Sequence, residues 1–341
     1  MLGSSRFESF DRLLSKAGAE SMLRLCERFG HYGMYGEESI EDDFGEGLAQ
    51  RHDAILNFLN TGGRFGRKES IDRLVARTNY FRETYAYGET QVEGIEPFRN
   101  HEGFAEAARK VHDCRVVEPN IVYANLLVPG QELAVHTDVP EFRGANRKRD
   151  PQWLLVAMHH SGLFDRWRMP IATAVSWFGN PRGGEFVFYP TGAQGPPVAL
   201  PVHHNTAILL DTDSIFHGVD RVSEARAPLP ELRPGMQLTY RGTGNWQVGL
   251  GDRVLEHYTW DDLRFSVSWK AYCYADEADR RRVHEHSEDQ DRRFVLDTLS
   301  ADLRERGRIG DKLPDDTELA LTIIDEYIAY PPASPAPAPA G

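Results

Sequence analysis

Residues Tyr123 to Asp138 read YANLLVPGQELAVHTD, two short apolar segments that are joined by a Pro129-Gly130 turn and end in His136-x-Asp138. In an extended chain, residues i and i+2 project from the same face, so this imidazole and this carboxylate can bind one metal ion from one side. By itself, a His-x-Asp tripeptide is a weak signal and is more often a surface turn. A metal site at this position needs a third ligand from elsewhere in the chain.

The third candidate ligand is His217, which lies in TAILLDTDSIFHGVDRV. In this segment an apolar run from Ala207 to Leu210 leads through a polar turn to the histidine. Two histidines and one carboxylate occupy one triangular face of an octahedron and leave three positions open, which is the arrangement of non-haem iron oxygenases. We therefore predict an iron(II) site formed by His136, Asp138 and His217.

The segment from Tyr123 to Tyr274 resembles the iron(II)- and 2-oxoglutarate-dependent dioxygenases, in particular their prolyl-hydroxylase-like branch. That branch has a Pro-Gly turn before His-x-Asp, a strand ending in Asn and Gly-Gly-Glu, an apolar strand, and then His-x-x-x-x-Val. This chain has VPGQELAVHTD, SWFGNPRGGEFVFYP and TAILLDTDSIFHGVDRV in the same order. The resemblance implies a mainly β fold with flanking helices around a double-stranded β-helix core of the jelly-roll or cupin kind. It also implies iron(II) and 2-oxoglutarate as cofactors, with O2 as cosubstrate.

Two further segments of the predicted core are interpreted as strands. Gly183-Gly184 separates the strand-like runs AVSWF and EFVFYP and predicts the tight connection of a hairpin. Glu185 then belongs to that hairpin, and a contact with substrate is the alternative. The apolar run from Trp153 to Met158 is also predicted as a strand. Many strands separated by turn signals are typical of a sandwich or a barrel.

An enzyme of this family needs a fixed cation for the distal carboxylate of 2-oxoglutarate, and the planar fork of arginine can bond both carboxylate oxygens. RFSVSWKAYCY places Arg264 and Ser266 on one face of a strand. The resemblance implies that such an Arg-x-Ser on the last barrel strand binds the cosubstrate. In the family this arginine follows the second histidine much more closely than Arg264 follows His217. Arg226 is therefore the rival, although its proline-rich surroundings make a poor strand.

If Arg264 is the anchor, residues 223 to 262 are an insertion, formed by a loop and a hairpin built on MQLTY and NWQVGL. Insertions beside an active site are often lids or substrate walls, and surface decoration is the alternative. Asn125 lies on one strand face with Tyr123, just before the proposed metal ligands. The resemblance implies that such a position contacts the cosubstrate, and a packing role is the alternative.

The chain divides into four predicted regions. Residues 1–115 form a helical support region, in which helical spacing is found over 5–28, 51–59, 69–77 and 104–112. Residues 116–275 form the catalytic core. Residues 276–330, which are rich in charge and in helix formers, form a helical appendage. Residues 331–341 are a Pro/Ala tail that is predicted to be disordered.

Bulk composition excludes several classes of partner. The net charge of −13 argues against binding to a nucleic-acid backbone. The three cysteines are odd in number and far apart in sequence, which favours a reducing compartment over a disulfide framework. The chain has no apolar run of membrane-spanning length and no signal-like start. We expect a cytoplasmic protein that does not bind a membrane. The sequence does not determine the oligomeric state.

Two other groups of residues attract attention. Four basic residues lie close in sequence to the proposed metal ligands: Arg143, Arg147, Lys148 and Arg149. They either bind an acidic group of the substrate or belong to a solvated loop. The His-His pairs at 159–160 and 203–204 have no carboxylate or cysteine at ligand spacing, so they are interpreted as structural or exposed.

These observations predict an oxygenase that hydroxylates an unactivated C–H bond of a small molecule, such as an amino acid or a natural-product intermediate, with release of succinate and CO2. The presence of Asp138 favours hydroxylation, since related halogenases carry a small residue there. The same triad also supports desaturation, ring closure and epimerisation, so these reactions stay open. The alternatives are a hydroxylase of protein or peptide side chains and a non-catalytic ligand-binding barrel. A small-molecule substrate is favoured because the insertion can enclose a pocket and the sequence shows no peptide-binding motif.

Overall fold

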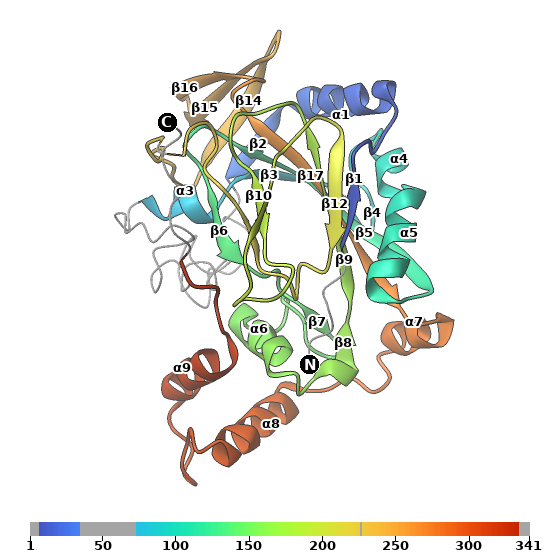
Figure 1. Cartoon of the computed structure of the whole chain (residues 1–341), viewed down its shortest axis with the longest axis vertical. Helices are drawn as coiled ribbons and strands as arrows, with labels where there is room; N and C mark the ends of the chain where they lie inside the picture. The colour runs from blue at the N-terminus through green and yellow to red at the C-terminus, as the bar shows by residue number, and fades with distance from the viewer. Residues whose placement is uncertain (1–6, 35–72, 226, 334–341) are drawn as a thin grey trace.

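The computed structural model describes residues 7–34, 73–225 and 227–333, and it contains two antiparallel sheets that face each other (Figure 1). In spatial order, the strands of the major sheet are β1 (Phe7–Phe10), β12 (Thr206–Leu210), β9 (Ile171–Phe178), β17 (Arg264–Tyr274), β5 (Val116–Leu127), β3 (Phe81–Tyr87), β2 (His31–Met34), β14 (Met236–Gly242), β15 (Asn245–Leu250) and β16 (Arg253–Thr259), with β4 (Glu89–Thr90) paired to β3. The minor sheet consists of β11 (Val198–Leu200), β10 (Phe186–Phe188), β13 (His217–Val219) and β6 (Leu133–His136).

From β5 onward the chain passes back and forth between the two sheets. It runs from β5 to β6, returns to β9, crosses to β10 and β11, returns to β12, crosses to β13 and ends in β17 of the major sheet. Side chains from both sheets meet between them, and Trp177 and Ile208 of the major sheet pack with Phe186 and Phe188 of the minor sheet. Two facing sheets connected in this way form a jelly roll, so the predicted fold class is confirmed.

Helices cover the outer face of the major sheet (Figure 1). These are α1 (Lys16–Phe29), α4 (Glu96–Arg99) and α5 (Glu102–His112). Phe104 of α5 packs on Trp269 of β17 with ring centroids 5.3 Å apart. The helical spacing over residues 104–112 predicted α5 correctly.

The described part of the N-terminal region contains strands as well as helices. Residues 7–10 form β1, which pairs with β12, and α1 begins only after Ser15, whose side chain accepts a hydrogen bond from the Gly18 backbone. Strands β2, β3 and β4 also come from this region and extend the major sheet. Of the other predicted helices, residues 51–59 lie outside the described residues. The segment 69–77 is described only from residue 73, and the short helix α3 (Val75–Thr78) begins two residues later.

The prediction of a strand from Trp153 to Met158 was wrong, because these residues belong to helix α6 (Gln152–Ser161). A short apolar run does not distinguish a buried strand from a helix that is buried on several sides. Here α6 packs with α8 (Arg292–Glu305) and α9 (Asp316–Tyr327), and the three helices share a second hydrophobic core. Because this core surrounds α6 with apolar side chains, the sequence of α6 lacks the separate apolar and polar faces of an amphipathic helix.

The prediction of a hairpin at Gly183-Gly184 was also wrong. Strand β9 pairs with β12 and β17, whereas β10 pairs with β11 and β13, so the glycines connect two different sheets. Both glycines have positive φ, and a Cβ on Gly184 would lie 2.7 Å from Cδ of Arg264. The glycine pair therefore serves a close crossing between the sheets.

The predicted hairpin within residues 223–262 is present. Strands β14 and β15 pair antiparallel, β16 adds to β15, and β14 pairs with β2. This segment thus extends the major sheet beyond β2. Among the described residues, none from this segment lines the two cavities at the proposed metal site, so its position favours decoration of the sheet over a lid.

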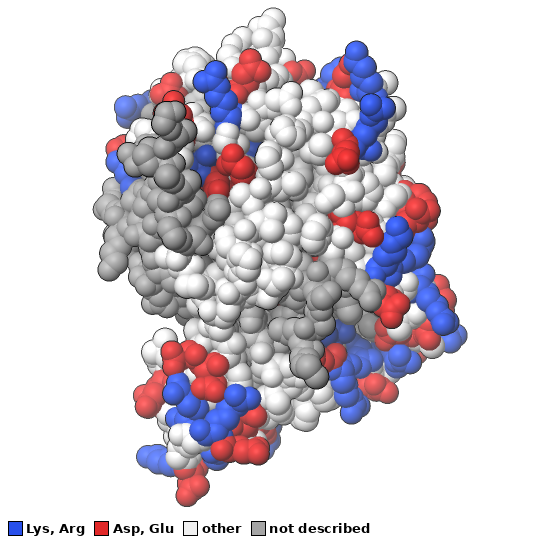
Figure 2. Space-filling view, viewed as in Figure 1, with Lys and Arg blue, Asp and Glu red and all other residues white. Residues whose placement is uncertain are grey.

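The C-terminal region is helical, as predicted, and comprises α7 (Glu277–His284), α8 and α9. Figure 2 shows Lys and Arg side chains interspersed with Asp and Glu side chains over the α8–α9 pair. A small sheet of β7 (Glu141–Phe142) and β8 (Arg168–Met169) lies near α6. Across the described ranges, no helix has the length and apolarity that crossing a membrane requires. Cys26, Cys114 and Cys273 are free thiols.

A partly buried ion cluster fixes the start of β6. Both carboxylate oxygens of Glu132 are engaged, one by Arg77 and the other by Arg221 at 2.9 Å. We predict that Glu132→Ala lowers the free energy of unfolding by about 3 to 5 kcal/mol, because it leaves buried cations without their carboxylate. The control is Glu231→Ala, which breaks an exposed pair with Arg73 and should cost less than about 1 kcal/mol. Urea unfolding of both variants measures the difference, and equal losses would contradict the prediction.

Candidate metal and cosubstrate site

The three predicted metal ligands are close together in space. His136 ends β6 and pairs in register with His217 at the start of β13, and their rings lie 4.5 Å apart between centroids. Asp138 follows β6 by two residues, and its Oδ1 lies 3.9 Å from Nε2 of each histidine. One ligand atom from each of the three residues lies within 4.8 Å of the others. The pairing of two strands therefore assembles the triad.

Hydrogen bonds to backbone carbonyls orient the rings of both histidines. Nδ1 of His136 lies 2.8 Å from the Ala134 carbonyl, and Nδ1 of His217 lies 2.9 Å from the Ile215 carbonyl. A carbonyl only accepts, so each Nδ1 carries the proton and each Nε2 offers its lone pair toward Asp138. This is the outer hydrogen bond that metal-binding histidines typically make. Two neutral imidazoles and a carboxylate suit iron(II), with three positions left for other ligands.

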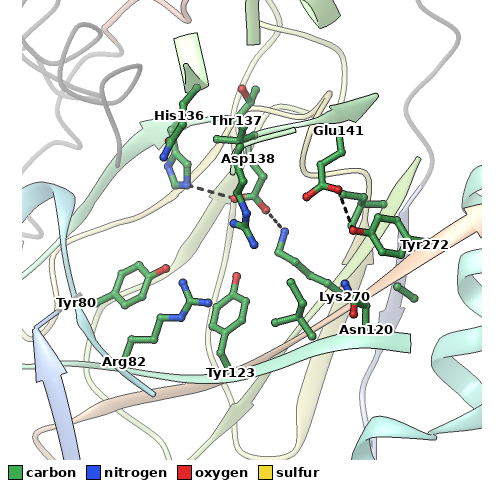
Figure 3. A pocket seen from close by; sticks show the side chains of 16 residues that line it. Tyr80, Arg82, Asn120, Tyr123, His136, Thr137, Asp138, Glu141, Lys270 and Tyr272 are labelled. Atoms are coloured by element: carbon green, nitrogen blue, oxygen red, sulfur yellow. Dashed lines mark hydrogen bonds and ion pairs between the residues drawn. The ribbon is translucent and has the colours of Figure 1, made fainter. Parts of the chain in front are cut away.

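Lys270 of β17 holds the carboxylate of the triad (Figure 3). Its Nζ donates to Oδ2 of Asp138 at 2.6 Å. Burial by itself raises the pKa of Asp138, but the charge of Lys270 and the hydrogen bond from its ammonium oppose this effect, and the pKa is held well below its usual range. Burial likewise lowers the pKa of Lys270, but Asp138 outweighs it and raises the pKa above its usual range. Asp138 is thus a carboxylate, as metal binding requires.

The sequence analysis did not include Lys270 in the site, although a signal for it was present. Arg264, Ser266, Ser268 and Lys270 alternate along RFSVSWKAYCY, so they share one face of β17. If Arg264 points into the barrel, the alternation along the strand means that Lys270 points inward as well. A lysine at an inward position needs an anion, and Asp138 is that anion.

A cavity between the sheets joins the triad to the predicted cosubstrate residues. Its lining includes His136, Asp138 and His217 on one side and Arg264, Ser266 and Asn125 from β17 and β5. Leu133, Val175 and Phe186 supply apolar wall. The residues predicted separately for metal and cosubstrate thus line one space.

Arg264 is 2% exposed and only partly hydrogen-bonded. Its Nε donates to the Gly184 carbonyl at 2.6 Å, one terminal nitrogen lies 3.5 Å from Ser266 Oγ, and the other terminal nitrogen is buried without a partner. Burial lowers the pKa of Arg264 to about 9, and Glu185 opposes this shift. A buried guanidinium with an orphaned nitrogen is suited to a carboxylate ligand. The rival Arg226 lies outside the described residues.

Asn125 faces the same cavity. Its Nδ2 lies 3.4 Å from Ser268 Oγ, and its Oδ1 is buried without a hydrogen-bond partner. This unpaired oxygen is available to a donor inside the cavity. A residue that served only for packing would have no need of a buried, unpaired oxygen.

A second cavity meets the first at the metal ligands, and both are lined by Tyr80, Tyr123, His136 and Asp138. The rest of its lining is largely polar and includes Arg82, Asn120, Glu141, Arg147, Gln152, Lys270 and Tyr272 (Figure 3). The Arg82 guanidinium lies 3.9 Å from the centre of the Tyr123 ring. The Tyr272 hydroxyl donates to Glu141 at 2.8 Å. This space is the candidate substrate pocket.

The four basic residues predicted near the site have different environments. Arg147 lines the second cavity. Arg143 is buried and donates to the Arg166 carbonyl at 2.6 Å, and Lys148 lies over the Tyr87 ring. Arg149 accepts a hydrogen bond from Arg292 at its carbonyl. The structure therefore brings only one of the four, among these described residues, to the site.

The histidine pairs have structural contacts. His159 and His160 lie on α6, and burial lowers the pKa of these two residues to about 3 and about 4, so both are neutral. Nε2 of His159 lies 2.9 Å from Ser214 Oγ. Nδ1 of His204 accepts a hydrogen bond from the Gly179 backbone. Within the described parts of the chain, only the triad groups three ligand-type residues in reach of one ion.

No protein-family model and no curated protein sequence matches the chain. Solved structures with a similar arrangement include a 2OG-Fe(II) oxygenase family oxidoreductase from Burkholderia pseudomallei, at 14% identity and TM-score 0.33 over 57% of this chain and 66% of that one. A prolyl-4-hydroxylase from Pseudomonas putida matches at 10% identity and TM-score 0.37, over 80% and 94% of the two chains. The carbocyclase SnoK from nogalamycin biosynthesis matches at 8% identity and TM-score 0.41, over 79% of this chain and 80% of that one.

We predict that His136→Ala and His217→Ala each weaken Co(II) binding by at least about 100-fold. Loss of a hydrogen-bond partner of a metal-binding histidine lowers metal affinity about 10- to 100-fold, and loss of the histidine itself should cost no less. The control is His257→Ala, which removes an exposed histidine of β16. Calorimetric titration with Co(II) measures the affinities. Unchanged binding in either ligand variant would exclude that histidine from the site.

Proposed function

We propose that this chain is an iron(II)- and 2-oxoglutarate-dependent oxygenase that hydroxylates an unactivated C–H bond of a small molecule, with release of succinate and CO2. The observation that carries the proposal is one cavity with the His136–Asp138–His217 triad on one side and the buried, incompletely paired Arg264 among its other walls. A 2-oxo acid that chelates a metal at the triad and carries a distal carboxylate for Arg264 matches both features of this cavity. Neither feature is needed by a barrel that serves only as a scaffold.

The roles of the residues follow from their positions. His136, Asp138 and His217 would hold iron(II), and Arg264 with Ser266 would bind the distal carboxylate of 2-oxoglutarate, with Asn125 beside it. When bound, the metal and 2-oxoglutarate supply the oxygen-activating chemistry. The apolar wall formed by Leu133, Val175 and Phe186 excludes water from that space. No side chain has to act as an acid or a base, so the protein contributes positioning.

The second cavity supports a small polar substrate. Its lining presents guanidinium groups, a carboxylate, amides and phenols directly beside the metal ligands. Such a mixture suits a molecule that carries both acidic and basic groups, such as an amino acid, because each group then has a partner. A peptide side chain is the second candidate, since it can reach the same cavity.

The first test is an anaerobic titration of the iron(II) protein with 2-oxoglutarate, which follows the visible charge-transfer band of the chelate. We expect Arg264→Ala to weaken 2-oxoglutarate binding about 100-fold, because truncating one partner of a buried charge pair costs about 3 kcal/mol. Arg226→Ala should bind as the wild type does. Loss of the band only in Arg226→Ala would move the anchor to that residue, and no band in the wild type would reject the proposal.

The second test separates the two substrate classes. We expect free amino acids and other small polar molecules to stimulate succinate formation, whereas peptides should not, because the cavity beside the metal is lined by groups that match a small polar molecule. Asp138→Ala should abolish succinate formation, since it removes a metal ligand. Stimulation by peptides alone would favour the protein-hydroxylase alternative. Succinate is measured directly in each mixture.

A further inference from the structure

Lys270 has a fixed position beside the triad. It lies on β17 directly opposite Thr173 of β9, and its Nζ donates to Thr173 Oγ1 at 3.0 Å as well as to Asp138. Its side chain is 12% exposed. The register of two central strands therefore determines where this ammonium lies.

A closed ring of hydrogen bonds connects Lys270 to the backbone of Asp138. Thr212 Oγ1 donates to Thr173 Oγ1 at 2.7 Å, and the Thr212 carbonyl accepts from the backbone of Asp138 at 2.9 Å. Asp138 is thus held at its backbone by Thr212 and at its carboxylate by Lys270. Because both attachments lead back to Thr173, the carboxylate has little freedom to rotate.

The two oxygens of Asp138 have different partners. Oδ1 lies 3.9 Å from Nε2 of each histidine, whereas Oδ2 lies 2.6 Å from Lys270 Nζ. A carboxylate can bind a cation through one oxygen or through both. Here one oxygen faces the ligand set and the other is bonded to a cation, which opposes the approach of Oδ2 to a metal.

On the basis of the proposed iron site, we infer that Lys270 is a positioning residue that restricts Asp138 to bind the metal through Oδ1 alone. The position that Oδ2 would otherwise take then stays open. With 2-oxoglutarate bound through two atoms, three protein atoms leave one of six positions. Lys270 would keep that last position available to O2.

A purely structural role for Lys270 makes a different prediction. Removal of one partner of a buried ion pair destabilises the protein in either case. A structural lysine would leave the number of open metal positions unchanged. The distinguishing measurement is therefore the binding of a small gas molecule at the metal, not stability or turnover.

The experiment compares the wild type with Lys270→Met, which removes the charge, and with Lys270→Arg, which keeps it. Iron(II) affinity is measured first by anaerobic titration, and nitric oxide, as a stand-in for O2, is then titrated into the iron(II)–2-oxoglutarate protein. Lys270→Met should bind iron(II) about tenfold more tightly, because no cation competes for Oδ2. It should bind nitric oxide at least about tenfold more weakly, because Oδ2 occupies the last position. Lys270→Arg should restore both values toward the wild type.

A second variant guards against misfolding of Lys270→Met. Thr173→Val removes the other partner of Nζ but keeps the ion pair, so both affinities should shift in the same directions by a smaller factor. Unchanged nitric oxide affinity in a folded Lys270→Met or Thr173→Val protein would overturn the inference, and so would weaker iron(II) binding. A wild-type protein without iron(II) or 2-oxoglutarate binding would instead remove the proposed function, and the inference with it.

Discussion

The insertion of β17 between β9 and β5 is the constraint on which the rest of the site depends. Eight of its residues, Phe265 to Tyr272, pair with both neighbours, so its register is fixed from two sides. A one-residue slip would turn every inward side chain outward. The six residue-to-residue steps from Arg264 to Lys270 span about 20 Å along the strand. One strand thus places two cations at separate points of the barrel interior.

The two cations differ in how their charge is balanced. Lys270 has the carboxylate of Asp138, so that pair is electrostatically complete without any ligand. Arg264 has a carbonyl and a hydroxyl as neighbours, and one of its nitrogens has no partner. Glu185 offsets part of the burial cost of this charge, and an anionic ligand would offset more of it. The cavity therefore contains an incompletely paired cation at Arg264 and a charge-balanced pair at Lys270 and Asp138.

The sequence predicted the parts of the site that have local signals. His136-x-Asp138 follows a strand and a turn, and His217 follows an apolar run, so their chemistry could be assigned before their distance was known. The period of two along β17 places Lys270 inside the barrel, but its pairing with Asp138, 132 residues away in sequence, has no local signal. The errors at Gly183-Gly184 and at α6 have a common cause. A local pattern can predict a turn or an apolar run. Long-range packing decides which strands the turn connects and whether the apolar run is a strand or a helix.

The C-terminal helices also contribute to the site, through α6. Leu299 of α8 and Ile323 of α9 are fully buried in the core that surrounds α6. The first residue of α6, Gln152, lines the second cavity, and its His159 contacts Ser214 in the loop that leads to His217. Ser214 in turn donates to Asp211, which is paired with Arg168. Because α6 is held between the C-terminal helices and this loop, those helices support both a wall of the candidate substrate pocket and the segment that leads to His217.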